Sequence, residues 1–124
     1  MKILYPDENI CKAIKTWINA YYTFEDELNL KFLQIAIRTF CIYYELPTPK
    51  LKMRKRFKDT QCLGQCSDDG LLEFIYPSYY HPLGGNKKNR WIRMVFHELG
   101  HYYLWSNAEK KANEFEREMM RRCK

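Results

Sequence analysis

The spacing of three residues near the end of the chain constrains its fold more than any other feature. The segment 94–103 reads Met-Val-Phe-His-Glu-Leu-Gly-His-Tyr-Tyr, so that His97, Glu98 and His101 form an H-E-x-x-H pattern. On an α-helix, side chains four positions apart lie on one face, and the two histidines can direct imidazole nitrogens at the same metal ion. The pattern therefore predicts a helix that binds zinc.

Glu98 is predicted to be a general base and not a ligand. It lies beside the line that joins the two histidines, where its carboxylate can reach a metal-bound water. Zinc lowers the pKa of such a water from about 15.7 towards about 7, and Glu98 can take its proton as the hydroxide attacks a peptide carbonyl. These residues predict a zinc metallopeptidase with one Zn²⁺ per chain.

The residues around the motif carry no charge, which is typical of a helix that is buried on most sides. Gly100 is expected to leave open space beside the metal. The alternative is an ordinary core helix with two incidental histidines. We favour the metal site because three clustered polar side chains in a core would each need hydrogen-bond partners.

Length and composition predict one globular domain over residues 1–124, a single metallopeptidase-like domain. A chain of 124 residues can bury roughly two-thirds of its unfolded surface without disulfides. Hydrophobic residues make up 46% of the chain and charged residues 29%, which argues against disorder. The aromatic content of 16% predicts aromatic walls in the core and in a cleft.

The net charge of +6 allows nucleic-acid binding and also favours acidic protein substrates. Within residues 50–58 one strand face is basic, since Lys52, Arg54, Arg56 and Lys58 alternate with other residues. A phosphate-contacting ribbon is one interpretation of this face. A solvated strand face is favoured because it is the commoner fate of such runs.

No segment contains an apolar run long enough for a signal peptide or a membrane span, so we expect a cytoplasmic protein without membrane contacts. The 5 cysteines are odd in number and scattered, and they do not indicate a disulfide framework. Cys62 and Cys66 flank Gly64 and are expected to be two half-buried thiols in a hairpin. A second metal half-site or a redox pair is the alternative.

Two helices are predicted in the first third of the chain. Asp7 can cap a helix that runs from about Glu8 to Thr23, with apolar residues at three-and-four spacing. Thr23 then begins the second helix, because Asp26 follows it at the spacing of a capping box. This helix reaches Glu45, and two prolines close it.

From Leu51 the apolar period changes to two, which predicts a strand over residues 51–58. Further strands are expected around Thr60 to Leu63 and Leu71 to Tyr76, in a small antiparallel or mixed sheet. The helix that carries the motif is expected from about Asn89 to Trp105, and a turn leads into a last helix.

The predicted fold is therefore α+β, with two N-terminal helices, a small three-stranded sheet, the zinc-binding helix and a C-terminal helix. With the H-E-x-x-H segment on its third helix, the expected arrangement resembles a minimal zincin.

A catalytic zinc normally has three protein ligands and one open position. No histidine follows His101, so the third ligand is expected to be a carboxylate of the last helix, which offers Glu109, Glu114, Glu116 and Glu118. Glu109 is favoured because it lies in the first turn and can fold back on the metal helix. Glu116, on the same edge, is the second choice, and the other two are expected to face solvent.

The motif together with Glu-Lys-Lys-Ala-Asn-Glu-Phe at 109–115 resembles the gluzincin metallopeptidases, especially the compact ImmA/IrrE-type peptidases and minigluzincins. The resemblance covers about the last third of the chain. It implies that Glu109 is the third ligand and that Asn113 is hydrogen-bonded to a ligating histidine. It also implies that Leu71 to Tyr76 is the edge strand along which an extended peptide would bind.

The chain departs from the family pattern at two places. Glu116 replaces the usual alanine, and no downstream histidine is present to stabilise the oxyanion as in larger relatives such as thermolysin. Four residues are candidates for that role or for substrate contacts, with aromatic packing as the alternative: Tyr80, His81, Tyr102 and Tyr103. No N-terminal helix-turn-helix is recognisable, so cleavage of a repressor is not implied.

The C-terminal segment suggests latency. Some minigluzincins resemble zymogens whose own termini block the cleft, and residues 119–124 could act in this way. The Cys123 thiolate would then take the open position of the zinc.

Two hypotheses follow. The favoured one is a zinc endopeptidase that acts on a peptide or protein substrate. The alternative is a non-catalytic basic protein that binds nucleic acid or a regulatory partner and has a structural zinc; nucleic acid is the less favoured partner, and self-association is open.

Overall fold

The computed structural model describes residues 3–59, 62–104 and 108–123. In these ranges the predicted α+β class is confirmed, with helices at both ends of the chain and a three-stranded sheet between them. In chain order the elements are α1 (Glu8–Thr23), the 3-10 helix η1 (Glu27–Asn29), α2 (Leu30–Tyr44), β1 (Lys50–Arg54), β2 (Gly64–Cys66), β3 (Leu71–Ile75), the 3-10 helix η2 (Pro77–Tyr79), α3 (Lys87–Leu104) and α4 (Glu109–Arg122).

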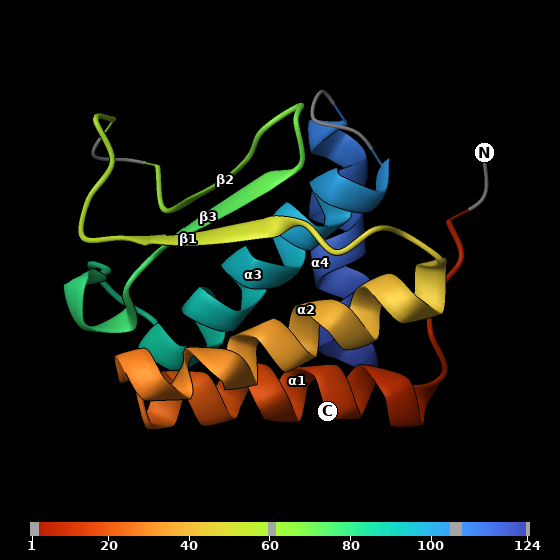
Figure 1. Ribbon diagram of the computed structural model, residues 1–124, viewed down its shortest axis with the longest axis horizontal. Helices are drawn as coiled ribbons and strands as arrows, with labels where there is room; N and C mark the ends of the chain where they lie inside the picture. The colour runs from red at the N-terminus through yellow and green to blue at the C-terminus, as the bar shows by residue number, and fades with distance from the viewer. Residues whose placement is uncertain (1–2, 60–61, 105–107, 124) are drawn as a thin grey trace.

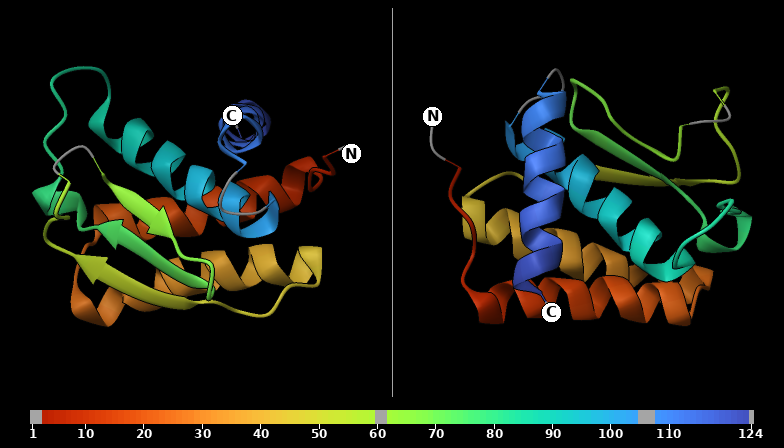
Figure 2. Two further views of the ribbon diagram at one scale, coloured as in Figure 1. Left: turned by 90° about the horizontal axis from the view of Figure 1, so that it is seen from above. Right: turned by 180° about the vertical axis from the view of Figure 1, so that it is seen from behind.

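Helices α1 and α2 lie side by side along one side of the molecule, and the strands lie along the opposite side (Figure 1). Helix α3 runs diagonally between them, with β2 packed beside it (Figure 2). Helix α4 runs crosswise to α1 and α2 and packs on α3. The two helices of the C-terminal third therefore meet next to the sheet.

None of the helices in the described ranges is both long and apolar enough to cross a membrane. The cytoplasmic location expected from the sequence stays a prediction.

The start of α1 is confirmed, since Asp7 Oδ1 accepts a hydrogen bond from the backbone N–H of Ile10 at 3.0 Å. The predicted cap of the second helix is wrong. Thr23 is the last residue of α1, and Asp26 caps η1 by accepting from the N–H of Leu28 at 2.6 Å. The chain uses these intervening residues to reverse direction before α2 begins.

The order of strands in the sheet is β1-β3-β2, with β1 parallel and β2 antiparallel to β3. A mixed sheet was among the expectations, but the expectation that Leu71 to Tyr76 forms an edge is wrong. Strand β3 is the central strand, and it is buried from Leu72 to Ile75, as is typical of a strand covered on both faces. The edge that lies next to α3 is β2.

The predicted ends of the other strands also differ from the structure. Strand β1 ends at Arg54, because its partner β3 ends at Ile75, just before Pro77. Strand β2 covers Gly64–Cys66 and not Thr60 to Leu63, of which residues 60 and 61 lie outside the described ranges.

Trp91 of α3 joins three elements in the core. It is fully buried, and its indole Nε1 donates a hydrogen bond to the backbone oxygen of Ile75 at 2.9 Å. Its ring lies 5.9 Å from Tyr21 of α1 and 6.5 Å from Phe74 of β3, measured between ring centroids. Burial of this large side chain and its satisfied N–H fix α3 against the sheet and α1.

The close approach of α4 to α3 depends on Gly100. A Cβ at this position would lie 3.0 Å from Cδ1 of Phe115, which is fully buried and stacks on Tyr5 at 5.6 Å. The open space expected beside Gly100 is therefore filled by a ring of α4. The glycine allows the two helix backbones to approach within the H-E-x-x-H segment itself.

We expect Gly100→Ala to lower the free energy of unfolding of the metal-free protein by about 1–3 kcal/mol, because the new methyl group overpacks against Phe115. Urea titration with an unchanged m-value measures this. Gly84→Ala is the control, since its Cβ would meet nothing within 4 Å, and it should change stability by no more than about 0.5 kcal/mol. Equal stability of both variants would show that α4 does not need the glycine.

Candidate metal centre

Three side chains from two helices converge beside the sheet. The imidazole rings of His97 and His101 lie on one face of α3, 4.8 Å apart between centroids. Glu109, the first residue of α4, lies against both: His97 Nε2 is 3.0 Å from its Oε1, and His101 Nε2 is 2.9 Å from its Oε2. One carboxylate therefore spans the two histidines, as the sequence predicted for the third member of the cluster.

The donor set fits a metal ion. The potential ligand atoms of the three residues all lie within 4.8 Å of one another. Within the described ranges, no other group of three or more His, Cys, Asp or Glu residues is placed so that it could hold a metal ion. In a tetrahedral zinc site with bonds of about 2.0–2.1 Å, ligand atoms lie roughly 3.3 Å apart. The side chains of His97 and His101 are 15% and 7% exposed, whereas that of Glu109 is 68% exposed, so an ion has access from the side of α4.

A second carboxylate, that of Glu116, contacts the ring nitrogen of His97 that does not face Glu109. Its Oε1 lies 3.1 Å from His97 Nδ1, and its Oε2 lies 3.4 Å from Nε of Arg93. The hydrogen bond to Glu116 raises the pKa of His97 above its usual value. Such a partner fixes the tautomer and the orientation of a ligating histidine.

The resemblance assigned this partner role to Asn113, and the structure gives it to Glu116. Asn113 is exposed, and in the described parts of the chain it makes no hydrogen bond to either histidine. The sequence signal for Glu116 was its place on the same helix edge as Glu109, two turns further on. That edge suggested a second candidate ligand and not a hydrogen-bond partner.

We expect Glu116→Ala to weaken zinc binding by about 10- to 100-fold, because His97 loses the group that orients its ring. Titration against a chromophoric chelator measures the affinity. Asn113→Ala is the matched control on the same helix, and its affinity should stay within about twofold of wild type. If Asn113→Ala weakened zinc binding and Glu116→Ala did not, Asn113 would be the hydrogen-bond partner that the family resemblance implies.

The side chain of Glu98, a residue of α3, lies between this helix and strand β2. Its side chain is largely buried, and a Cβ on Gly64 would lie 3.0 Å from its Cγ and 2.8 Å from Sδ of Met94. The glycine therefore lets the edge strand lie directly over the carboxylate. Burial raises the pKa of Glu98, against the opposing effect of the two nearby histidines. A carboxylate with a raised pKa is a stronger proton acceptor.

A cavity of about 380 Å³ adjoins the cluster, lined by β2, Leu63 and the residues of the motif. Cys62 and Cys66 lie on its β2 side, half buried, as predicted for thiols in a hairpin. Burial raises the pKa of Cys66 to about 11 and also that of Cys62. Protonated thiols are weak nucleophiles, and among the described residues neither cysteine belongs to a group of three potential metal ligands, so the alternatives of a second metal half-site and a redox pair gain no support.

Two of the four candidates for oxyanion or substrate contacts are occupied elsewhere. The Tyr102 hydroxyl donates a hydrogen bond to the backbone oxygen of Pro47, and the Tyr103 ring stacks on Tyr44 with centroids 4.0 Å apart. Tyr80 and His81 line a second cavity next to His97. Tyr102 and Tyr103 therefore hold α3 against the end of α2, which is the packing role weighed for them.

The predicted blockage of the metal site by the C-terminal segment is wrong for the residues that the structure describes. Cys123 is buried beside Cys11 and follows the far end of α4, a helix of 14 residues that begins at Glu109. At 1.5 Å per residue this places Cys123 roughly 20 Å from Glu109 along the helix. Lys124 lies outside the described ranges.

Comparison of the chain with known protein families, with curated proteins and with solved structures finds no match. The interpretation of the site therefore depends on its own residues and their geometry.

Proposed function

We propose that this protein is a zinc-dependent endopeptidase in which His97, His101 and Glu109 hold the metal ion. The observation that carries the proposal is the convergence of two imidazole Nε2 atoms on one carboxylate, at 3.0 and 2.9 Å, from two separate helices. Two histidines and one glutamate are a ligand set of catalytic zinc, which keeps one position open.

When bound, zinc supplies Lewis acidity, which lowers the pKa of a coordinated water towards about 7 and polarises a carbonyl. The role of the protein's own groups follows from their environment. Glu98 is adjacent to His97 but outside the cluster of three, and its raised pKa suits it to accept the proton of the attacking water. It can then donate that proton to the leaving amine.

The substrate on this proposal is an extended peptide or an exposed segment of a protein. Strand β2 pairs with β3 along one side and stands at the edge of the sheet, and its residues line the cavity that contains Glu98 and the histidines. The other edge of such a strand offers N–H and C=O groups to a peptide in β conformation. We therefore propose β2, in place of Leu71 to Tyr76, as the strand that pairs with substrate.

The alternative of a nucleic-acid-binding protein gains no support from the strand that suggested it. Arg54 forms an ion pair with Glu73 of the central strand, a residue that is 5% exposed. One cation of the basic face is therefore used to neutralise a buried carboxylate inside the sheet.

We expect Glu98→Gln to lower the rate of peptide hydrolysis by at least about a hundredfold while the protein still binds one zinc per chain, because the amide cannot accept the proton. Cleavage of a mixed peptide library, read by mass spectrometry, measures the rate and the preferred cleavage sites. Elemental analysis measures the zinc.

Glu114→Gln is the matched control, because it makes the same change at an exposed position of α4, and it should keep the wild-type rate of hydrolysis. Equal cleavage by wild type and Glu98→Gln would contradict the assigned base. Absence of cleavage by a wild-type protein that holds one zinc would contradict the endopeptidase.

A further inference from the structure

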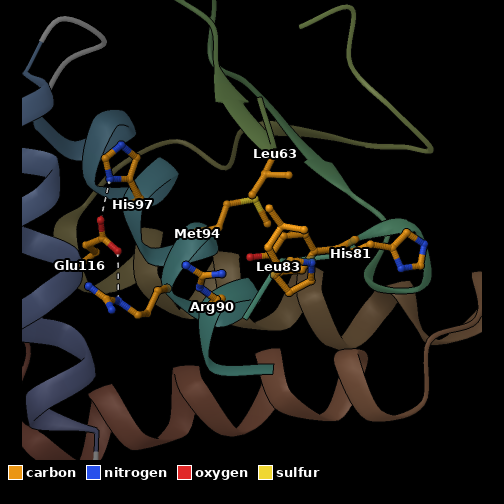
Figure 3. A pocket seen from close by; sticks show the side chains of 10 residues that line it. Leu63, His81, Leu83, Arg90, Met94, His97 and Glu116 are labelled. Carbon is orange, nitrogen blue, oxygen red and sulfur yellow. Dashed lines mark hydrogen bonds and ion pairs between the residues drawn. The ribbon is translucent and has the colours of Figure 1, made fainter. Parts of the chain in front are cut away.

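A second cavity of about 500 Å³ lies beside the metal cluster (Figure 3). It shares Leu63, Met94 and His97 with the first cavity, so the two are adjacent spaces along one wall. Its other walls come from α3 and from the segment between η2 and α3, with Arg90, Arg93 and Leu83 among them.

The cavity follows the face of α3 that carries the metal ligands. Arg93 lies four residues before His97 and Arg90 lies seven residues before it, which is about 6 Å and about 10 Å along a helix axis. Extended peptide advances about 3.3 Å per residue. A group on the residue next to the scissile bond, or on the following one, therefore has the reach to enter this cavity.

The charges in the cavity do not balance. It is lined by two arginines and one carboxylate, that of Glu116. This carboxylate already contacts both Arg93 and His97, at 3.4 and 3.1 Å. In the described ranges, no carboxylate lies within 4.0 Å of the Arg90 guanidinium. The cavity therefore has an excess of positive charge, centred on Arg90.

The Arg90 guanidinium is held in place by the loop that precedes α3. Its Nη1 donates a hydrogen bond to the backbone oxygen of Gly84 at 2.8 Å. A Cβ on Gly85, which has φ +76°, would lie 3.5 Å from Cδ and Nε of the same side chain. Among the residues that the structure describes, this is the one hydrogen bond of the guanidinium, so its other N–H groups are available to a ligand.

We propose that the cavity receives a carboxylate of the substrate, with Arg90 as the residue that binds it and Leu63 and Met94 as contacts for its apolar stem. Guanidinium and carboxylate form forked, charge-assisted hydrogen bonds. The preferred substrates are then peptides with an acidic side chain, or a free C-terminus, close to the scissile bond. This proposal deepens the endopeptidase proposed above and rests on it.

The test uses binding as well as cleavage. Two fluorescein-labelled nonapeptide libraries, both with amidated C-termini, have random flanks and either Glu or Gln at the central position. A third, with central Gln, has a free C-terminus. Anisotropy measures their binding to zinc-loaded Glu98→Gln protein, and mass spectrometry measures cleavage by wild type. We expect the Glu library to bind about tenfold more tightly than its Gln counterpart and to be cleaved about tenfold faster.

Three variants assign the effect. Arg90→Gln should reduce the preference for Glu over Gln to less than about twofold. Arg90→Lys should keep part of this preference, because lysine keeps the positive charge but lacks the two parallel N–H groups of the guanidinium. Arg38→Gln removes the same charge from an exposed position on α2 beside a different cavity, and it should keep the full preference. Circular dichroism and urea titration show that each variant is folded.

The outcomes separate the two proposals. A preference confined to the free C-terminus supports the carboxylate site, identifies the end of the chain as its source, and overturns the endopeptidase in favour of a peptidase that cuts near the C-terminus. Equal binding of all three libraries, or a preference that survives in Arg90→Gln, overturns the inference. Preference for Glu in binding, dependent on Arg90 but without cleavage by wild type, supports the carboxylate site and overturns the endopeptidase.

Discussion

The contact between Gly100 and Phe115 brings the candidate metal centre together. Because residue 100 has no side chain, the ring of Phe115 lies against the backbone of α3, and α4 starts beside the two histidines. In this arrangement the carboxylate of Glu109 lies 3.0 Å from His97 Nε2 and 2.9 Å from His101 Nε2. The close packing around Phe115 therefore helps to determine the distance between Glu109 and the two histidines.

Charge is arranged in the site as a chain of partners. Arg93 contacts Glu116, which contacts His97, which faces Glu109. Each partly buried charge thus has an opposite neighbour, as burial requires. Glu98 differs, because it is largely buried and its pKa is raised by the loss of water. The proposed hydrolysis depends on this arrangement, in which a buried proton acceptor lies beside side chains that are paired with one another.

The sheet gives the site its second wall, and here the sequence was a poorer guide. The apolar run from Leu71 predicted a strand correctly, but whether a strand is central or at an edge depends on which strands pair with it. Strand β2 has three residues and no apolar alternation, so periodicity could not locate it. Its place over Glu98 follows from Gly64, whose role is visible in the packing alone.

The sequence by itself determined the helix that carries the motif, the α+β class, and the common face of His97 and His101 in the candidate metal centre. These depend on short-range spacing, which helix geometry converts directly into a shared face. The tertiary structure alone decided that Glu116 and not Asn113 contacts His97, that β2 is the strand beside the site, and that Cys123 is far from it. These contacts and positions depend on how helices and strands that are distant in the sequence pack together, and a local sequence pattern does not predict such packing.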